Sequence, residues 1–325
     1  GLMKKESVKQ EARYSKGNAL QNRPVNRTLK LMRNNWALYL FILPSLLYLI
    51  VFHYVPMYGI QIAFKNYFPS RGIWGSPWVG GMWFKAFFTS PMFFNLLKNT
   101  LILSLYGLAA GFPIPIILAL MINYVSNEKF KKATQTITYM PHFIFTVVLV
   151  GMMSSFFSPN TGFVNTFLSF FGCKPVYFMG SSGVFRHLYV WSGVWQGAGW
   201  GSIIYIASLS NVNPELHESA IIDGASKIRR IWNIDLPAIL PTTVTLLILD
   251  CGSILGVGFE KVYLMQNPLN TGVSEVISTY TYKIGLIQSE FSYSTAIGLF
   301  NTVINFMILI LVNKIAGKLS GNSLW

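Results

Sequence analysis

Six long apolar stretches limit what this chain can fold into more than any other feature. They cover residues 36–58, 96–123, 135–157, 184–209, 238–258 and 293–313. A helix of about 20 apolar residues crosses the ~30 Å hydrocarbon core of a bilayer, so each stretch can span it. Only 11% of the 325 residues are charged, against roughly 25% in an average soluble domain. We therefore predict an all-α integral membrane protein with six transmembrane helices between residues 36 and 315.

The Lys and Arg residues fall mainly on one set of alternating loops. The tail 1–35 carries nine of them, and 17 of the 25 lie in this tail, in 124–134, in 210–236 and near the C-terminus. Cytoplasmic loops are enriched in Lys and Arg, so both termini are expected in the cytoplasm. The first apolar stretch is long enough to span and is interpreted as an uncleaved helix. The last segment, 316–325, is expected to be a cytoplasmic C-terminus.

The net charge of +14 and the pI near 9.7 first suggest a nucleic-acid partner. Membrane topology explains this charge, and no basic stripe interleaved with stacking aromatics is found, so no nucleic acid is expected. The two cysteines, Cys173 and Cys251, cannot form a disulfide framework or a four-ligand metal site.

Two of the segments expected outside the cytoplasm differ in kind from the others. Residues 59–95 are rich in aromatics, Gly and Pro, which is typical of an interfacial segment or of a packed lid. Residues 259–292 hold a short amphipathic pattern that is too polar to span. Within the fourth stretch, Gly193, Gly197 and Gly201 recur at four-residue spacing, which favours close helix packing in lipid.

The segment 213–237, between the fourth and fifth stretches, has the most informative local pattern. Asn213 is a good helix cap and Pro214 suits the first helical position, so a short helix is predicted to begin there. Gly224 can end that helix in a turn, after which a second short helix is expected to run until Pro237 stops it. The pattern predicts a cytoplasmic helix-turn-helix with one apolar face.

This segment also carries a family resemblance. It resembles the EAA motif of ABC-importer permeases, E-A-A-x-x-D-G-A followed by L-P, with Ser219 in place of the middle Ala and Ile231 in place of the usual Phe. The matching residues are Glu218, Ser219, Ala220, Ile221, Ile222, Asp223, Gly224 and Ala225, followed by Leu236 and Pro237. Residues 96–315 as a whole are similar to the MalF/MalG-type sugar permeases. Within that family the chain is most similar to permeases for oligosaccharides and polysaccharide fragments, acidic alginate among them.

The resemblance implies a multi-subunit importer in the bacterial inner membrane. Two homologous permeases form the path, a dimer of ATPase subunits binds ATP and Mg, and an external solute-binding protein delivers the sugar. The helix 214–222 would then seat in a cleft of the ATPase, with Glu218 at its rim and Gly224 turning the backbone. The residues expected to couple to the ATPase are Glu218, Ser219, Ala220, Asp223, Gly224, Ala225 and Pro237.

The chain shows no machinery of its own for chemistry. No G-x-x-x-x-G-K-[ST] loop occurs, so neither ATP nor another cofactor is expected in this chain, and catalytic residues are not expected either. His217-Glu218 resembles the start of a zinc-binding H-E-x-x-H helix, but Ile221 stands where the second His is needed. No metal site is predicted.

An ion-driven secondary transporter remains the alternative function. Coupling ions need carboxylates within the membrane, and the chain places Asp250 inside a predicted span. A substrate-pathway role and a structural hydrogen bond are both open for this residue. For a sugar path, aromatic rings and amides are the expected tools, which adds Tyr205, Asn301 and Asn305 as candidates. Hydrogen bonding between helices would explain these three polar residues equally well.

Overall fold

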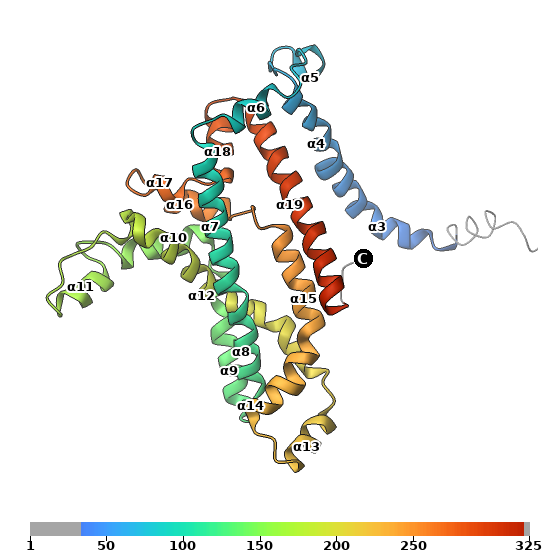
Figure 1. Cartoon of the computed structure of the whole chain (residues 1–325), viewed down its shortest axis with the longest axis vertical. Helices are drawn as coiled ribbons and strands as arrows, with labels where there is room; N and C mark the ends of the chain where they lie inside the picture. Colours follow the sequence, from blue (N-terminus) through green and yellow to red (C-terminus); the bar gives the residue numbers. More distant parts are fainter. Residues whose placement is uncertain (1–33, 322–325) are drawn as a thin grey trace, which may run out of the picture. The chain divides into compact units, whose positions relative to one another are not determined.

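Residues 34–321 are described by a computed structural model, and their regular secondary structure is helical (Figure 1). An isolated antiparallel bridge between Lys65 and Trp78 is the one β contact in that range. The predicted all-α class is confirmed for this part of the chain. The basic tail up to residue 33 and residues 322–325 lie outside the described residues. The chain divides into two compact units, Gly1–Ile60 and Gln61–Trp325.

The first unit holds the helix α3 (Trp36–Leu49), a π-helical turn (Ile50–Tyr54) and α4 (Val55–Met57). Pro56 has no N–H and its ring crowds the preceding turn, so the regular hydrogen-bond pattern cannot continue through it. The helix widens just before this proline, where Val55 N–H donates to the Ile50 carbonyl. No side chain of α3 is buried within the chain, as expected for an apolar helix surrounded by lipid.

In the second unit, three helical segments are long and apolar enough to cross a membrane. The first combines α7 (Phe93–Gly111) with α8 (Pro113–Asn123), the second ends in α15 (Leu236–Gly252), and the third is α19 (Phe291–Ser320). With Trp36–Phe64 they make four candidate spans among the described residues. The helix α12 (Ser182–Ser210) has 29 residues, which is also long enough, but its Gly, Ser and Gln make it less apolar.

A bent helix pair stands where the sequence predicts one helix over 135–157. The chain forms α9 (Glu128–Tyr139), a 3-10 turn (Met140–Phe143) and α10 (Thr146–Phe156), bent by 97°. The stretch is not one straight helix, because Ile144 and Phe145 are extended after Pro141. Gln196 of α12 donates 2.7 Å to the Ile144 carbonyl, which satisfies a backbone group freed by the bend. Counted as one span, the pair would be a fifth.

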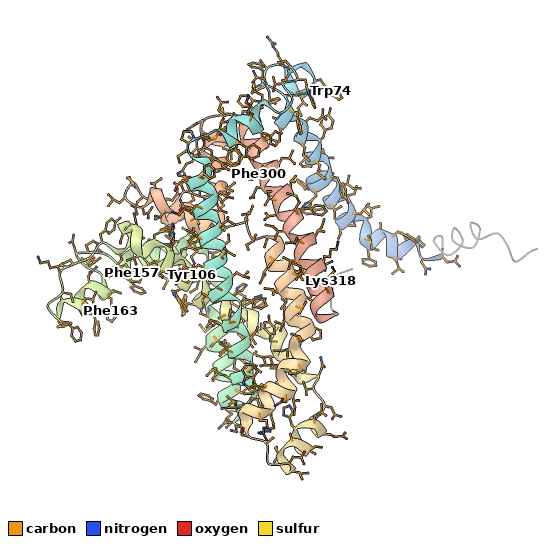
Figure 2. The ribbon with its side chains drawn as sticks, in the orientation of Figure 1. Trp74, Tyr106, Phe157, Phe163, Phe300 and Lys318 are labelled. Carbon is orange, nitrogen blue, oxygen red and sulfur yellow. The ribbon has the colours of Figure 1, made fainter. Side chains whose placement is uncertain are left out.

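The remaining helices are short and join these segments. They are α5 (Gly72–Gly75), α6 (Met82–Phe88), α11 (Phe163–Ser169), α13 (Pro214–Ile222), α14 (Lys227–Arg230), α16 (Phe259–Met265), α17 (Thr271–Ser274) and α18 (Ile277–Tyr282). An aromatic cluster joins α6, α7 and α19, where the rings of Phe87 and Phe300 lie 5.5 Å apart between centroids (Figure 2). This cluster packs the segment 82–93 against the N-terminal part of α19.

Some glycines of α12 lie against a neighbouring segment, whereas others face open space. At Gly199 an added Cβ would lie 2.0 Å from the Thr138 carbonyl oxygen, so α9 and α12 approach at backbone distance there. At Gly201 the nearest atom would be 3.2 Å away, in Pro115. At Gly197 no atom lies within 4 Å, so close packing does not explain this residue. The predicted packing at four-residue spacing is therefore only partly realised.

Candidate coupling segment and transport pathway

The coupling segment, residues 213–237, begins as its sequence predicts. Pro214 opens α13, and the Asn213 side chain accepts a hydrogen bond of 3.0 Å from the Glu215 amide. This cap satisfies one of the amide groups that the first turn leaves without a helical partner. Glu215 lies in the same turn, where its negative charge is favourable near the helix N-terminus.

The turn after α13 depends on Gly224, which has φ +75°. Its amide donates 3.0 Å to the Ile221 carbonyl, and the Ala225 amide donates 2.8 Å to the Ala220 carbonyl. These two bonds define a Schellman motif, in which the left-handed residue is usually glycine because a Cβ is strained there. The Ser226 side chain then caps α14 by accepting from the Arg229 amide at 3.3 Å. The first short helix, the turn at Gly224 and the start of a second helix therefore follow in the predicted order.

Pro237 does not stop the second helix, so that prediction is wrong. From α14 the chain continues through a π-helical turn (Ile231–Asp235) directly into α15. The wider turn just before Pro237 accommodates a residue that has no amide to donate. As a result, the coupling segment is joined to a membrane-spanning helix without an intervening loop.

A polar cluster around the buried Asp235 attaches the coupling segment to the end of α8. Asp235 is 0% exposed and accepts a hydrogen bond of 2.7 Å from the Tyr124 hydroxyl at the end of α8. His217 Nε2 of α13 lies 3.3 Å from the other carboxylate oxygen. The Arg230 guanidinium of α14 lies 5.5 Å from the centre of the Tyr124 ring. The cluster thus connects α8, α13, α14 and the start of α15.

The Tyr124 hydroxyl remains a hydrogen-bond donor at neutral pH. Burial and the hydrogen bond to Asp235 raise its pKa to about 12. The sequence analysis missed both Tyr124 and Asp235. The available signal was an acid in the run from Ile231 to Leu240, where Asn233 is the one other polar residue.

Large apolar side chains cover the outer surface of the coupling segment. Ile222 is 85% exposed, and the other exposed members are Leu216, Ile221, Ile228 and Trp232. Of the motif residues, Glu218, Ser219, Asp223 and Gly224 are exposed, whereas Ala220 and Ala225 are partly buried. Large apolar side chains exposed on one short segment are typical of a protein-binding site.

Asp250 lines a hollow of about 320 Å³. The hollow is bordered by α7, α12, α15 and the segment after Gly252 (residues 253–258), which is not helical although the sequence predicts a span to 258. A neighbouring hollow of about 370 Å³ shares Gly107, Gly111 and Tyr189 with the first. It is also lined by Gly193, Gly197 and Lys261.

The other three predicted pathway residues lie elsewhere. Tyr205 is buried in the core between α8, α12 and α15. Asn305 accepts a hydrogen bond of 3.0 Å from the Leu255 amide, so it satisfies the non-helical backbone after α15. Asn301 lines a separate hollow with Phe259 and Tyr282, and its side-chain oxygen is buried without a partner. The structure therefore brings only Asp250, of these four residues, to the two hollows that share Tyr189.

No group of three or more His, Cys, Asp or Glu residues in the described part of the chain could hold a metal ion.

A family model described as "Binding-protein-dependent transport system inner membrane component" matches residues 111–321. This match includes the whole coupling segment and both hollows except Leu103, Ser104, Gly107 and Leu108.

Similar proteins of Bacillus subtilis extend this match towards the N-terminus. The polygalacturonan/rhamnogalacturonan transport system permease YteP is 45% identical over 89% of this chain and 90% of its own. Protein LplB is 43% identical over 91% of this chain and 92% of its own.

A crystal structure of a bacterial ABC transporter that imports the acidic polysaccharide alginate contains a chain with a similar fold. The TM-score is 0.84 with 41% identity, covering 90% of this chain and 99% of that one. A chain of a bacterial alginate ABC transporter in complex with an alginate-pentasaccharide-bound periplasmic protein matches with a TM-score of 0.84 and 40% identity, covering 92% of this chain and 100% of that one. The family model and the similar permeases identify the same family, and the fold and the coupling segment are consistent with it. This chain belongs to the family of binding-protein-dependent ABC-transporter permeases.

Proposed function

We propose that this chain is one of two permease subunits that form the membrane path for an acidic oligosaccharide or polysaccharide. The support is the similarity, at 40% identity or above, to a permease for polygalacturonan and rhamnogalacturonan and to an alginate importer. All three polymers contain uronic-acid residues, so they share carboxylates on sugar rings. An external solute-binding protein delivers the saccharide to the path.

The energy comes from a dimer of ATPase subunits that docks on the coupling segment. The observation that carries this part is the exposed apolar surface around Ile222, held in place by the buried Asp235 cluster. ATPase closure moves α13, and the continuous helix from α14 into α15 carries that motion into the membrane. The residues that couple to the ATPase are Glu218, Ser219, Ala220, Asp223, Gly224, Ala225 and Pro237.

Six helices cross the bacterial inner membrane in this proposal, with both termini in the cytoplasm. Four of these are the apolar candidate spans, the fifth is the bent pair α9–α10, and the sixth is the 29-residue helix α12. The distribution of Lys and Arg supports this orientation, because it places the coupling segment on the side where ATP is found.

The ion-driven alternative depends on Asp250, which lines a hollow and makes no side-chain hydrogen bond or ion pair with the described residues that would explain it structurally. We expect Asp250→Asn to keep ATP-driven uptake within about twofold of wild type, because Asn preserves the volume while removing the proton-binding carboxylate. The measurement is uptake of alginate oligosaccharide or oligogalacturonate into vesicles that contain the complete transporter.

The same vesicles separate the two energy sources. With ATP inside and ionophores present, uptake should persist. With an ion gradient and no ATP, uptake should be absent. Gradient-driven uptake that Asp250→Asn abolishes would establish the secondary transporter instead.

A further inference from the structure

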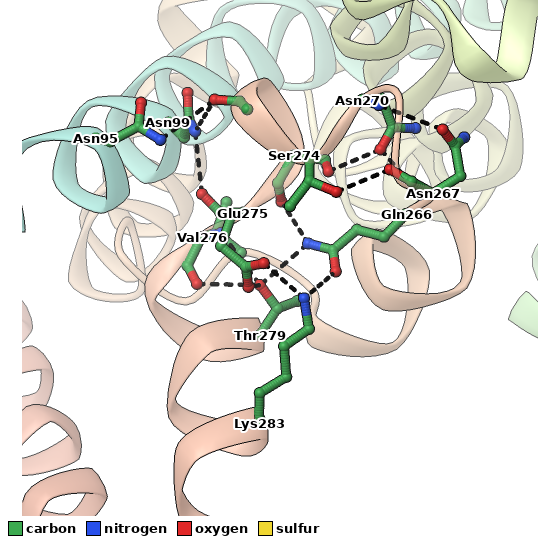
Figure 3. Close-up of polar contacts among 12 residues, drawn as sticks. Asn95, Asn99, Gln266, Asn267, Asn270, Ser274, Glu275, Val276, Thr279 and Lys283 are labelled. Carbon is green, nitrogen blue, oxygen red and sulfur yellow. Dashed lines mark hydrogen bonds and ion pairs between the residues drawn. The ribbon is translucent and has the colours of Figure 1, made fainter. Parts of the chain in front are cut away.

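Three basic residues on the predicted outer side, Arg186, Lys261 and Lys283, could meet an acidic saccharide. Lys283 is already neutralised. Its ammonium lies 2.5 Å from a carboxylate oxygen of Glu275 and donates 2.9 Å to the Gln266 side chain (Figure 3). Glu275 is 5% exposed and also accepts 2.7 Å from the Thr279 hydroxyl, so the pair is a fixed structural element of the loop 266–283.

Arg186 belongs to the same framework. It donates 3.1 Å to the Asn99 side-chain oxygen, and Asn99 in turn donates to the Gly272 and Glu275 carbonyls at 3.0 and 3.1 Å. Arg186 therefore helps to attach α12 and α7 to the loop 266–283, and it lines neither of the two hollows that share Tyr189.

Lys261 differs from both, because it lines the 370 Å³ hollow. Its ammonium donates 2.9 Å to the Tyr189 carbonyl and lies 5.1 Å from the centre of the Tyr189 ring. No carboxylate of a described residue lies within ion-pair distance of it. Burial lowers the pKa of Lys261 to about 8, which leaves most of the side chain charged at pH 7.

The surroundings of Lys261 leave room for a sugar ring. An added Cβ at Gly193 would lie 3.2 Å from the Lys261 ammonium, so this ammonium lies close to the backbone of α12 at Gly193. At Gly107, Gly111 and Gly197 no atom lies within 4 Å of an added Cβ, so these small residues border open space. The ammonium has three N–H groups, and the Tyr189 carbonyl takes one of them.

We propose that Lys261 binds the carboxylate groups of uronic-acid residues as the saccharide passes the hollow beside Tyr189. This inference rests on the proposed function and adds the residue that recognises the charge of the substrate. A sugar carboxylate supplies the anion that the partly buried ammonium lacks, and the charge-assisted hydrogen bond holds each ring only until the next one replaces it. Lys283 cannot take this role, because Glu275 already neutralises it.

The test uses Lys261→Gln, which removes the charge, and Lys261→Arg, which keeps it. Lys174→Gln, at an exposed lysine of the predicted outer side, is the matched control. Vesicles with the complete transporter are assayed for uptake of alginate oligosaccharide and oligogalacturonate. Hydrolysis of ATP stimulated by the unloaded binding protein is measured in parallel as a check of assembly. We expect Lys261→Gln to lower uptake at least tenfold while ATP hydrolysis is unchanged. Lys261→Arg and Lys174→Gln should each keep at least half of the wild-type uptake.

The possible failures are distinguishable. Wild-type vesicles that take up neither acidic saccharide contradict the proposed function itself. Wild-type uptake that Lys261→Gln leaves unchanged overturns only the role of Lys261. A variant Lys261→Gln that also loses the hydrolysis, or a loss that Lys261→Arg does not restore, assigns the residue a structural role and overturns the inference as well.

Discussion

Replacing Gly224 by valine is expected to lower ATP-driven uptake at least tenfold while the protein still inserts into the membrane. Gly224 has φ +75°, and the left-handed conformation costs an L-residue roughly 1–2 kcal/mol, with β-branched side chains affected most. The strain falls on the Schellman turn that ends α13, so the helix end and the exposed Ile222 beside it move. The measurement is co-purification of the ATPase subunits together with substrate-stimulated ATP hydrolysis.

Gly224→Asn is the control for this prediction. Asn tolerates the left-handed conformation better than other residues, and no atom lies within 4 Å of an added Cβ at this position. It should retain most of the coupling, and Glu218→Lys should weaken it less than valine does, because it alters charge and leaves the turn intact. A valine variant that keeps both ATPase binding and stimulated hydrolysis would show that the turn has no part in transmission.

Asp235→Leu should be as damaging as the valine variant, for a different reason. The change leaves the Tyr124 hydroxyl without its acceptor and removes the carboxylate 3.3 Å from His217. A hydrogen bond to a charged group contributes about 1.5–3 kcal/mol. We expect a lower thermal midpoint in detergent and a loss of coupling of about tenfold or more, since about 1.4 kcal/mol corresponds to a tenfold change in an equilibrium constant.

Tyr124→Phe should show the same effects more weakly, because the carboxylate keeps His217 as a partner. Glu128→Gln, an exposed acid at the start of α9, should change neither property. If Asp235→Leu matches wild type in both thermal midpoint and coupling, the buried cluster does not support the coupling segment.

The parts of the site that the sequence predicted are local in the chain. Asn213, Pro214 and Gly224 act on backbone groups within a few residues, so their types already define the cap, the first turn and the end of α13. The class of the fold follows in the same way from apolar stretches of sufficient length. These signals need no knowledge of which helices are neighbours.

The parts that the sequence analysis missed depend on contacts between distant segments. Asp235 meets Tyr124 across 111 positions, and Gln196 reaches the Ile144 carbonyl at the bend across 52. Asn305 was a reasonable candidate for a sugar path, but the Leu255 amide occupies it. Pro237 was misinterpreted because a π-helical turn before a proline can replace a helix end.

Accessibility of a cysteine at position 222 tests the central claim most directly, namely that the coupling segment faces the cytoplasm and is covered by the ATPase. Ile222→Cys is introduced after Cys173 and Cys251 are changed to serine, and a membrane-impermeant thiol reagent is applied from either side. The chain with only the native, exposed Cys173 reports the outer side. We predict that Cys at 222 reacts only from the cytoplasmic side and that bound ATPase subunits protect it. Labelling from outside, or cytoplasmic labelling that the ATPase does not reduce, would contradict the account.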